Sequence, residues 1–591
     1  MEVRILTESP IISPISRTSI LSYKYKLKST DTVDQQIVYK IKVIPRKVGN
    51  STCKGYLDIN DGIWNINKLD LSFHKGSLKL YDKFRLQQSY EQVRDSLWIP
   101  YRQEFTYESK SGRRKTFKGS TVYHYSDFQA NYQFPDKFFG NEVAVTKQEA
   151  YKKDSSYWNS ARPEPLTLKE QEMMHHRDSI YAAHNTTEYK DSIEARYNKV
   201  TLGEVIIHGV GFRNYRKKKQ HSHGSLSSLI GFEVIGGFRL GPRSSYFKRW
   251  ESGKSIWTSG SMNIGLNNTD VQGNGSVNFT YAPMKGGRIS VSGGRTFSSI
   301  NPTDAYLNQL RRSNYYLHDN IGASHRIELF NGFYFNAGFR YAERRSTSSY
   351  NSNTFIGEII NDETPLDFQD YSAFTTNLSF SYTPKQQYIT EPKWKVILGS
   401  DYPTFTLSHR RGWNGPLSSD IDFDLLEFRI NQKLTLGVLG NSQYTVKTGK
   451  FINTNTLRLI DQKRFRQSDP ILYSDPLSSF QLLDTALIAT KPYIEAHHIH
   501  HFNGALINNI PLIKKLRFGV VAGAGILWVQ ESNYRHSEIF AGVERVFKFG
   551  ARRRLRIGVY GVAAQSNSSP LKTDFKVSFD LIDTWMSDWN F

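Results

Sequence analysis

From residue 231 to the C-terminus, apolar and polar residues alternate in runs of about ten, the length at which a tilted strand crosses a bilayer. One run places Phe333, Phe335, Ala337, Phe339 and Tyr341 on a single face. A period of two is the pattern of a β-strand whose two faces meet different environments. The region is therefore predicted to form a large antiparallel β-structure.

Two architectures contain many alternating strands: soluble β-proteins and membrane barrels. The face opposite the apolar one is small and polar, which suits a wet lumen, and aromatic residues near strand ends suit membrane interfaces. At about 22 residues per strand and loop, residues 231–591 predict a transmembrane antiparallel β-barrel of about 16 strands. A soluble all-β repeat protein stays the alternative, although we find no fixed repeat period.

Helical membrane spans are not expected. The longest clean apolar run, Phe518 to Val529, has 12 residues, whereas a transmembrane helix needs about 18 or more. The first ten residues, MEVRILTESP, contain no apolar stretch typical of a secretory signal. The chain is therefore predicted to be either cytosolic or incomplete at its N-terminus.

The chain upstream of the barrel divides into two parts. Residues 1–150 contain short alternating strands with a hairpin signal at Asp61-Gly62, which predicts a β-sheet domain. In residues 151–225, Thr167-x-x-Glu170 predicts a capping box at the start of a helix. The stretch to Tyr197 is helix-compatible, and residues 212–228 are basic and polar, so we expect a helical connector and a basic junction before a barrel at 226–591.

The composition excludes several functional classes. A single cysteine, Cys53, rules out an internal disulfide framework and a cysteine-rich zinc module. The net charge of +22 would suit nucleic acid if the cations were clustered on a recognisable fold. The main basic cluster is Arg216 to Lys219 and the other cations are scattered, so no nucleic-acid partner is predicted.

A histidine cluster is the main candidate for a metal site. His498 and His500 would share one strand face, and His497 and His501 the other, together with Glu495. Two imidazoles on one face could bind a transition metal, but a strand end at a membrane interface is the preferred interpretation.

The other polar residues are weaker candidates for a catalytic or metal site. Asp420, Asp422 and Asp424 alternate and could bind Ca²⁺ loosely, although a solvated face is preferred. Glu172 and His176 do not form a zinc-protease motif. Likewise His221 and His223 are expected to be solvated, and Cys53 is expected to be an unreactive thiol. The prediction is that the chain has no catalytic, cofactor-binding or metal-binding residues, and no cofactor.

Three stretches resemble one known family. They are Tyr157 to Thr167 followed by Glu170, Ile12 to Ile15 running into Tyr23-Lys24-Tyr25 and Tyr39 to Pro45, and Glu495 to Gly504 ending at Ile510-Pro511-Leu512. They resemble the DUF5686 family, outer-membrane proteins of the Bacteroidota that often carry a carboxypeptidase-regulatory-like domain in front. The resemblance spans essentially the whole chain and implies a β-barrel with periplasmic N-terminal sequence. Because members begin with a signal peptide and a small β-sandwich, it also implies that this chain lacks its N-terminal part.

These observations together predict a non-enzymatic outer-membrane β-barrel protein with its N-terminal part in the periplasm. We expect a role in transport or envelope assembly, with an adhesive or structural anchor whose barrel is plugged as the alternative. A hydrolase with a site at the barrel rim is a third class, for which no motif is present. The expected partners are outer-membrane lipid and lipopolysaccharide, and envelope or periplasmic proteins.

Overall fold

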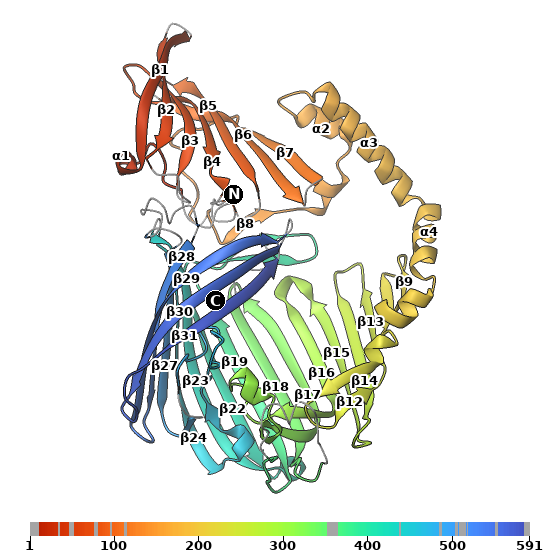
Figure 1. Ribbon diagram of the computed structural model, residues 1–591. Coiled ribbons are helices and arrows are strands. Elements are labelled where there is room, and N and C mark those ends of the chain that lie inside the picture. Colours follow the sequence, from red (N-terminus) through yellow and green to blue (C-terminus); the bar gives the residue numbers. More distant parts are fainter. Residues whose placement is uncertain are drawn as a thin grey trace.

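The computed structural model describes residues 11–33, 36–46, 52–75, 78, 81–94, 97–111, 115–136, 138–350, 364–436, 439–483, 487–502, 506, 516, 518–549 and 553–583. Three parts follow one another: an N-terminal sheet, a helical arch and a large barrel-shaped sheet (Figure 1). The structure is mainly β, as predicted. Among the described helices, none is both long enough and apolar enough to cross a membrane.

The N-terminal sheet contains seven strands in chain order, each antiparallel to its neighbour. The elements are α1 (Ser19–Ser22), β1 (Tyr23–Val33), β2 (Gln36–Pro45), β3 (Cys53–Asn60), β4 (Ile66–Phe73), β5 (Lys83–Arg94), β6 (Leu97–Ser111) and β7 (Lys115–His124). Tyr23, Val43, Cys53, Leu57, Leu69 and Leu71 form its buried core. The predicted hairpin at Asp61-Gly62 is confirmed, since it joins β3 to β4 with a φ of 75° at Gly62.

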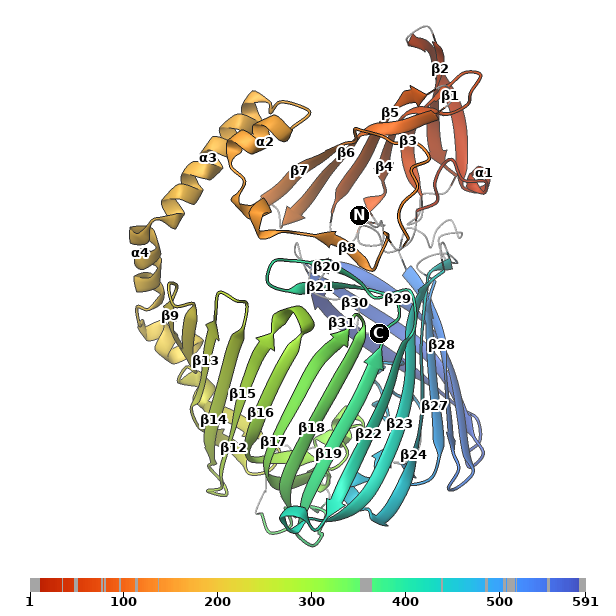
Figure 2. The same ribbon diagram turned by 180° about the vertical axis from the view of Figure 1, so that it is seen from behind.

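The helical arch connects the N-terminal sheet to the barrel-shaped sheet (Figures 1 and 2). Its elements are β8 (Glu142–Val145), η3 (Gln148–Lys152), α2 (Ser155–Ala161), α3 (Leu168–Asn185), α4 (Thr187–Tyr197) and η4 (Glu204–His208). The capping box predicted for α3 is confirmed, because Glu170 N donates to Thr167 Oγ1 at 3.3 Å and Thr167 N donates to Glu170 Oε2 at 2.9 Å. Within α2, α3 and α4 no residue is buried, so the arch is held by its ends.

The barrel-shaped sheet contains 19 strand segments within the described residues. They are β9 (Val210–Asn214), β10 (Lys219–His223), β11 (Ile230–Glu233), β12 (Gly237–Leu240), β13 (Arg243–Arg249), β14 (Ser255–Gly265), β15 (Val271–Ala282), β16 (Gly287–Ser299), β17 (Tyr315–Phe330), β18 (Phe333–Arg345), β19 (Tyr371–Tyr382), β22 (Thr404–Asn414), β23 (Asp420–Thr435), β24 (Asn441–Thr456), β27 (Tyr493–His501), β28 (Phe518–Val529), β29 (Tyr534–Phe549), β30 (Arg553–Ser566) and β31 (Lys572–Asp583). Short helices η5 (Ser227–Leu229), η6 (Pro283–Lys285), α5 (Tyr306–Gln309), η7 (Arg312–Asn314) and η8 (Pro416–Ser418) lie in the connections. From β13 to β31 each strand pairs antiparallel with the next one in this series.

The start of this sheet differs from the sequence prediction. Residues 212–228 were expected to be a basic junction ahead of a barrel at 226, but β9 and β10 form a hairpin that pairs with β13. The cations Lys217 and Lys218 occupy the hairpin turn, where Lys218 has a φ of 48°. Solvated charge here marks a turn between two strands. The number of spanning strands, about 16, stays a prediction.

Side chains alternate between two faces of the sheet. On β30, Val559 is 53% exposed and its neighbour Tyr560 is fully buried; on β28, Ile526 is 56% exposed and Leu527 fully buried. The exposed apolar set is the outer face, and the buried set points into the barrel. The alternation read from the sequence is thus present in the structure.

The two ends of the barrel-shaped sheet are different. At the end nearest the N-terminal sheet, which we call the rim, the strands β20 (Gln387–Thr390) and β21 (Lys395–Gly399) form a hairpin, and β20 pairs parallel with β8 (Figure 2). We call β8, β20 and β21 the rim sheet. The opposite end, the far end, carries the connections 300–314, 346–370 and 457–492, and the rim carries 383–403 and 502–517.

Candidate functional site: a segment folded inside the barrel

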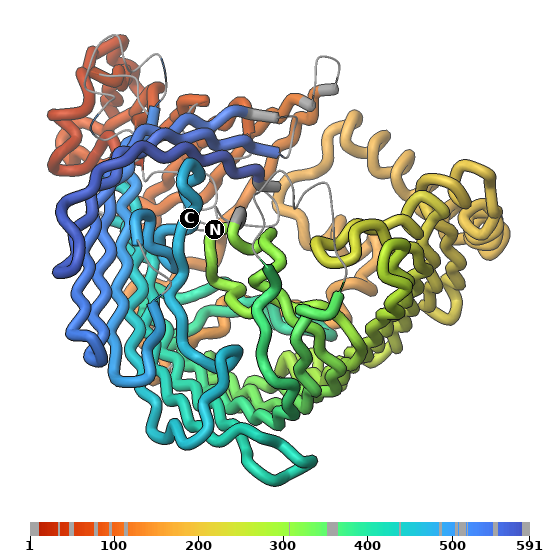
Figure 3. The backbone as a smooth tube through the Cα atoms, turned by 60° about the horizontal axis from the view of Figure 1, so that its bottom comes forward, coloured from red at the N-terminus to blue at the C-terminus, as the bar shows by residue number. Residues whose placement is uncertain are grey.

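The connection between β24 and β27 folds back into the barrel interior (Figure 3). We call residues 457–492 the lumenal segment; its described residues are 457–483 and 487–492. It contains the short helix η10 (Leu459–Asp461) and the two-residue strands β25 (Lys463–Arg464) and β26 (Ile488–Ala489), which pair with each other. Several independent contacts fix it to the inner wall.

Apolar packing covers the wall from β27 to β30. Phe465, Phe480, Leu483 and Ala489 of the lumenal segment cluster with Tyr493, Leu527, Val529 and Tyr534 of the strands. Tyr473 stacks on Tyr560 with ring centroids 3.8 Å apart and meets the edge of Phe540. Because these rings are shielded from water, their burial stabilises the docked position of the segment.

A buried ion pair joins the segment to β18. Arg344 Nη1 donates to Asp461 Oδ2 at 2.5 Å, and the two side chains are 9% and 3% exposed. Arg344 also donates to the Tyr371 hydroxyl at 3.1 Å, and Arg410 of β22 donates to the Asp461 carbonyl oxygen. Asp461 is therefore the counter-ion of a guanidinium that would otherwise be buried without one.

A second charged cluster lies between β23, β24 and β27. Lys463 of the segment approaches Glu427 at 3.5 Å and Glu495 at 3.7 Å, while Lys447 of β24 approaches the same carboxylates at 3.2 and 3.3 Å. Tyr493 donates its hydroxyl proton to Glu427. Two ammonium groups thus balance two carboxylates, and one of the four charges belongs to the segment.

The backbone of the segment is also held. Glu538 of β29, 2% exposed, accepts hydrogen bonds from Gln481 N at 2.8 Å and Leu482 N at 3.1 Å. At β31, Tyr473 N donates to Val577 O and Val577 N donates to Ile471 O, both at 2.9 Å. The segment therefore pairs, over one bridge, with the side of β31 that faces away from β30.

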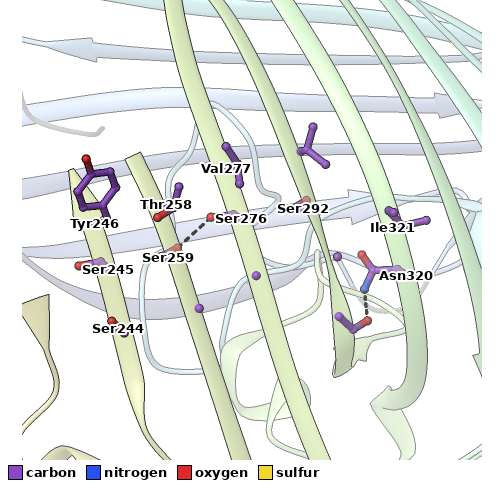
Figure 4. A pocket seen from close by; sticks show the side chains of 15 residues that line it. Ser244, Ser245, Tyr246, Thr258, Ser259, Ser276, Val277, Ser292, Asn320 and Ile321 are labelled. Carbon is purple, nitrogen blue, oxygen red and sulfur yellow. Dashed lines mark hydrogen bonds between the residues drawn. The ribbon is translucent and has the colours of Figure 1, made fainter. Parts of the chain in front are cut away.

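The inner wall from β13 to β16 lies away from these contacts. Ser245, Ser259, Ser276 and Ser292 pair with one another in register, forming a row of hydroxyls across four strands. Ser259 and Ser276 share a hydrogen bond at 2.9 Å (Figure 4), and Ser292 is exposed. The lumen therefore has one wall covered by the segment and one accessible wall lined by small polar groups.

The same strands carry a hollow of about 640 Å³. Its lining includes the cross-strand row Gly260, Gly275 and Gly293, with Tyr246 and Val277 beside it (Figure 4). Glycines thin the wall because they have no side chain. Apart from the Tyr246 phenol, the lining has no acid, base or thiol, so it offers no catalytic constellation.

The histidines of β27 divide between the two faces as the sequence predicts. His498 and His500 point outward and bond to Ser442 Oγ at 2.7 Å and to the Leu439 carbonyl at 2.9 Å. His497 and His501 are buried inside, where His501 lies 3.4 Å from Glu544. Among the described residues, no group of three or more His, Cys, Asp or Glu could hold a metal ion.

The other candidates also have protein partners or open positions. Asp420 accepts from Ser372 N at 3.1 Å, Asp422 from Asn453 at 2.7 Å, and Asp424 from His409 at 2.9 Å. Asp424 is buried, which the expected solvated face did not anticipate.

Further candidates lie outside the barrel wall or at its start. Glu172 and His176 lie on α3, whose residues are not buried. In β10, His221 lies against Tyr246 and His223 against Ser244. The stretch Ile510-Pro511-Leu512 lies outside the described residues.

The residues that fix the lumenal segment to the barrel wall were not predicted from the sequence. Asp461, Lys463 and Glu538 follow no motif, and their partners are distant along the chain. One signal was available: residues 457–492 form a long connection that contains no glycine and lacks the alternation of a strand. Such a stretch is typical of a connection with its own packing.

Two family profiles match the chain. "Family of unknown function (DUF5686) C-terminal domain" matches residues 203–543, and "Family of unknown function (DUF5686)" matches residues 2–128. No curated protein matches the chain.

Three solved structures match the chain at low similarity. BamA from Haemophilus ducreyi lacking POTRA domains 1–3 has 10% identity and a TM-score of 0.32, covering 62% of this chain and 71% of that one. Wzi of Escherichia coli, an outer-membrane carbohydrate-binding β-barrel involved in Group 1 capsule assembly, has 8% identity, a TM-score of 0.27 and coverages of 63% and 79%. OccK5 (OpdH) of Pseudomonas aeruginosa has 10% identity, a TM-score of 0.23 and coverages of 59% and 93%. At this level none of them supplies a role for the chain.

Proposed function

The chain belongs to the DUF5686 family, a family of unknown function, and from its structure we propose that it is a non-enzymatic outer-membrane β-barrel. In this proposal the lumen is a route for a polar solute or an envelope component, and the lumenal segment is its gate. The observation that carries the proposal is the asymmetry of the lumen. One wall is covered by a segment tied through buried charges, and the other is an accessible row of hydroxyls.

The outer face supports a position in a bilayer. Phe333, Tyr382 and Phe405 pair in a row near the rim, and Tyr341, Phe374 and Trp413 pair in a row toward the far end. Eight residues separate the two rows on β18, which is about 27 Å along a strand at 3.4 Å per residue, or about 20 Å along the barrel axis at a tilt of about 40°. The apolar band of an outer-membrane barrel is about 25 Å tall, so the aromatic rows have the spacing of two interfacial girdles.

The two longest connections, 346–370 and 457–492, lie at the far end, which supports an orientation. Outer-membrane barrels have short turns on the periplasmic side and longer loops outside. The rim, with the N-terminal sheet beside it, would then face the periplasm, and the far end would face the exterior. The Bacteroidota origin, a preceding carboxypeptidase-regulatory-like domain and periplasmic protein partners stay predictions of the family resemblance.

Planar-bilayer recording of the full chain tests the gate. The test variant is Asp461→Asn with Lys463→Gln, which removes both charges that the segment contributes to the two clusters. The matched control is Lys217→Gln, a charge removed from the exposed turn between β9 and β10. We expect rare openings in the wild type and the control, and frequent stepwise conductance in the test variant. A test variant that folds and inserts but conducts no more than the wild type would remove the gated route.

A plugged structural anchor is the second candidate. It is favoured by the redundancy of the segment's attachment, which combines stacked rings, two charged clusters and backbone bonds to Glu538 and Val577. An anchor predicts that the Asp461→Asn and Lys463→Gln variant stays closed, because the remaining contacts still hold the segment, and that it inserts normally into the outer membrane.

Lipopolysaccharide is the expected partner at the far end. Arg345 follows Tyr341 on the outer face of β18, and it approaches Asp319 at 3.0 Å and Glu343 at 2.7 Å. Arg295 of β16 lies 3.7 Å from the same Asp319. Guanidinium groups at this level suit lipid phosphates. Unchanged lipopolysaccharide binding after Arg295→Gln and Arg345→Gln would exclude this contact.

A further inference from the structure

An exposed aromatic cluster lies between β7 and β8. Tyr132, Phe134, Phe138 and Phe139 are 53%, 48%, 60% and 77% exposed, yet their rings contact each other. The Phe134 ring lies 4.8 Å from Phe138 and 4.6 Å from Phe139. A contiguous apolar patch of this kind on a protein surface marks a binding surface.

Exposed apolar residues follow the cluster along the chain into the rim sheet. Tyr388 N donates to the Asn141 carbonyl at 3.0 Å, so Phe139 is two residues from the junction of β8 with β20. Val143 and Val145 of β8 are 57% and 53% exposed. Across the rim sheet, Trp394, Ile397 and Leu398 are 47%, 50% and 48% exposed. We call these nine residues, Tyr132, Phe134, Phe138, Phe139, Val143, Val145, Trp394, Ile397 and Leu398, the rim patch.

The rim patch is fixed to the end of the barrel. The β20–β21 hairpin leaves β19 just after Tyr382 and returns to β22 just before Phe405, and both rings belong to the aromatic row near the rim. Lys395 of β21 lies 2.7 Å from Glu328 of β17 and sits over the Tyr388 ring at 4.1 Å. This buried ion pair ties the hairpin to the lumen-facing side of β17, because Glu328 pairs with Tyr334 and not with an outer-face residue. The hairpin is therefore fixed at the end of the barrel, and its two connections lead directly to the aromatic row near the rim.

We propose that the rim patch is an interfacial anchor that inserts into the phospholipid surface of the periplasmic leaflet beside the barrel. Aromatic side chains favour this depth, where the ring is apolar and the headgroups are wet. The anchor holds β8, and through it the N-terminal sheet, against the membrane. The inference rests on the proposed position of the barrel in the outer membrane and adds a lipid contact outside the barrel wall.

The test uses the full chain reconstituted in phosphatidylcholine vesicles. Cys53 is the single cysteine and is buried, so a Cys53→Ala background accepts one new labelling site at a time. The sites are Phe139→Cys in the rim patch, Val559→Cys on the outer face of β30, and Leu168→Cys at the start of α3, where the side chain is 79% exposed. Each is labelled with an environment-sensitive dye, and quenching by doxyl-labelled lipid is compared with quenching by iodide.

The anchor predicts that Phe139→Cys and Val559→Cys are both quenched several-fold more by doxyl lipid than Leu168→Cys, which iodide quenches instead. Quenching of Val559→Cys by lipid with Phe139→Cys accessible to iodide would overturn the anchor while leaving the barrel in the bilayer. That result would assign the rim patch to a protein partner. Loss of lipid quenching at Val559→Cys would overturn the proposed function itself.

A second variant tests whether the aromatic rings of the rim patch insert into lipid, with the dye placed on β8 and not on the rings. Phe134→Ser and Phe138→Ser are introduced together, with the dye at Val145→Cys on β8. If the rings insert, lipid quenching at Val145→Cys falls several-fold in this variant. Equal quenching with and without the two rings would contradict the anchor.

Discussion

Replacing Asp461 by asparagine isolates the charge that the lumenal segment presents to Arg344. The substitution keeps the shape of the side chain and leaves the Arg344 guanidinium buried without a counter-ion. The bond from Arg410 goes to the Asp461 carbonyl oxygen, so it survives the change. The quantity that changes is the free energy of undocking the segment from the barrel wall.

The magnitude follows from the burial of the pair. Arg344 and Asp461 are 9% and 3% exposed and 2.5 Å apart, and removing one partner of a buried pair costs about 3–5 kcal/mol. The asparagine oxygen still accepts a hydrogen bond and Tyr371 keeps its contact, so we expect the low end, about 3 kcal/mol. At about 1.36 kcal/mol per tenfold, the undocked population rises about 150-fold.

Limited trypsin digestion in lipid vesicles measures this population. The segment contains Lys463 and Arg464, and cleavage there follows the undocked fraction when docking is fast relative to cleavage. Asp178→Asn on the exposed α3 helix is the matched control and should leave the cleavage rate unchanged.

The reasoning also predicts a rescue. Arg344→Met combined with Asp461→Leu removes both charges, and apolar replacement of a buried pair is often neutral or stabilising. Cleavage in this double variant should return to within about tenfold of the wild type. A rate in Asp461→Asn within about threefold of the wild type, or a double variant as labile as the single one, would refute the assignment.

Three further predictions concern other parts of the chain. Burial raises the pKa of the Cys53 thiol, so it should resist Ellman's reagent at pH 8 until the N-terminal sheet unfolds in urea; rapid reaction of the folded protein would contradict this. Hydrogen bonds from Thr167 lower the pKa of Glu170, so its contribution to helix stability is present above the unfolded carboxyl pKa of about 4.3 and is lost as pH falls below it. Circular dichroism should show that Thr167→Ala weakens α3 by about 1 kcal/mol and reduces this acid dependence, because alanine removes the hydroxyl bond and keeps the backbone bond to Glu170. Tyr473→Ala should lower the free energy of undocking the segment by about 3 kcal/mol, because the buried ring stacks on the barrel wall. The measured result would be faster trypsin cleavage of the segment.

Local patterns predicted the elements of this fold. The alternation around Phe339 can be recognised from neighbouring residues alone, since a strand places every second side chain on one face. The Asp61-Gly62 turn and the Thr167 capping box are equally local.

The lumenal segment could not be predicted in this way. Asp461 meets Arg344 across 117 positions of sequence, and Gln481 meets Glu538 across 57. These pairs depend on which strand lies beside which wall, and a single sequence does not give that arrangement. The β9–β10 hairpin was missed for another reason: its strands are only five residues each and its turn is strongly basic.

Heat modifiability in the outer-membrane fraction tests the central claim, that the outer face of the barrel-shaped sheet lies in lipid. The full chain is expressed behind an added export signal, and extracted membranes are run on a gel with and without boiling. A barrel folded in the membrane should migrate differently before boiling, and Phe339→Asp on the outer face should abolish the shifted form. A soluble protein with one mobility under both conditions would contradict the account.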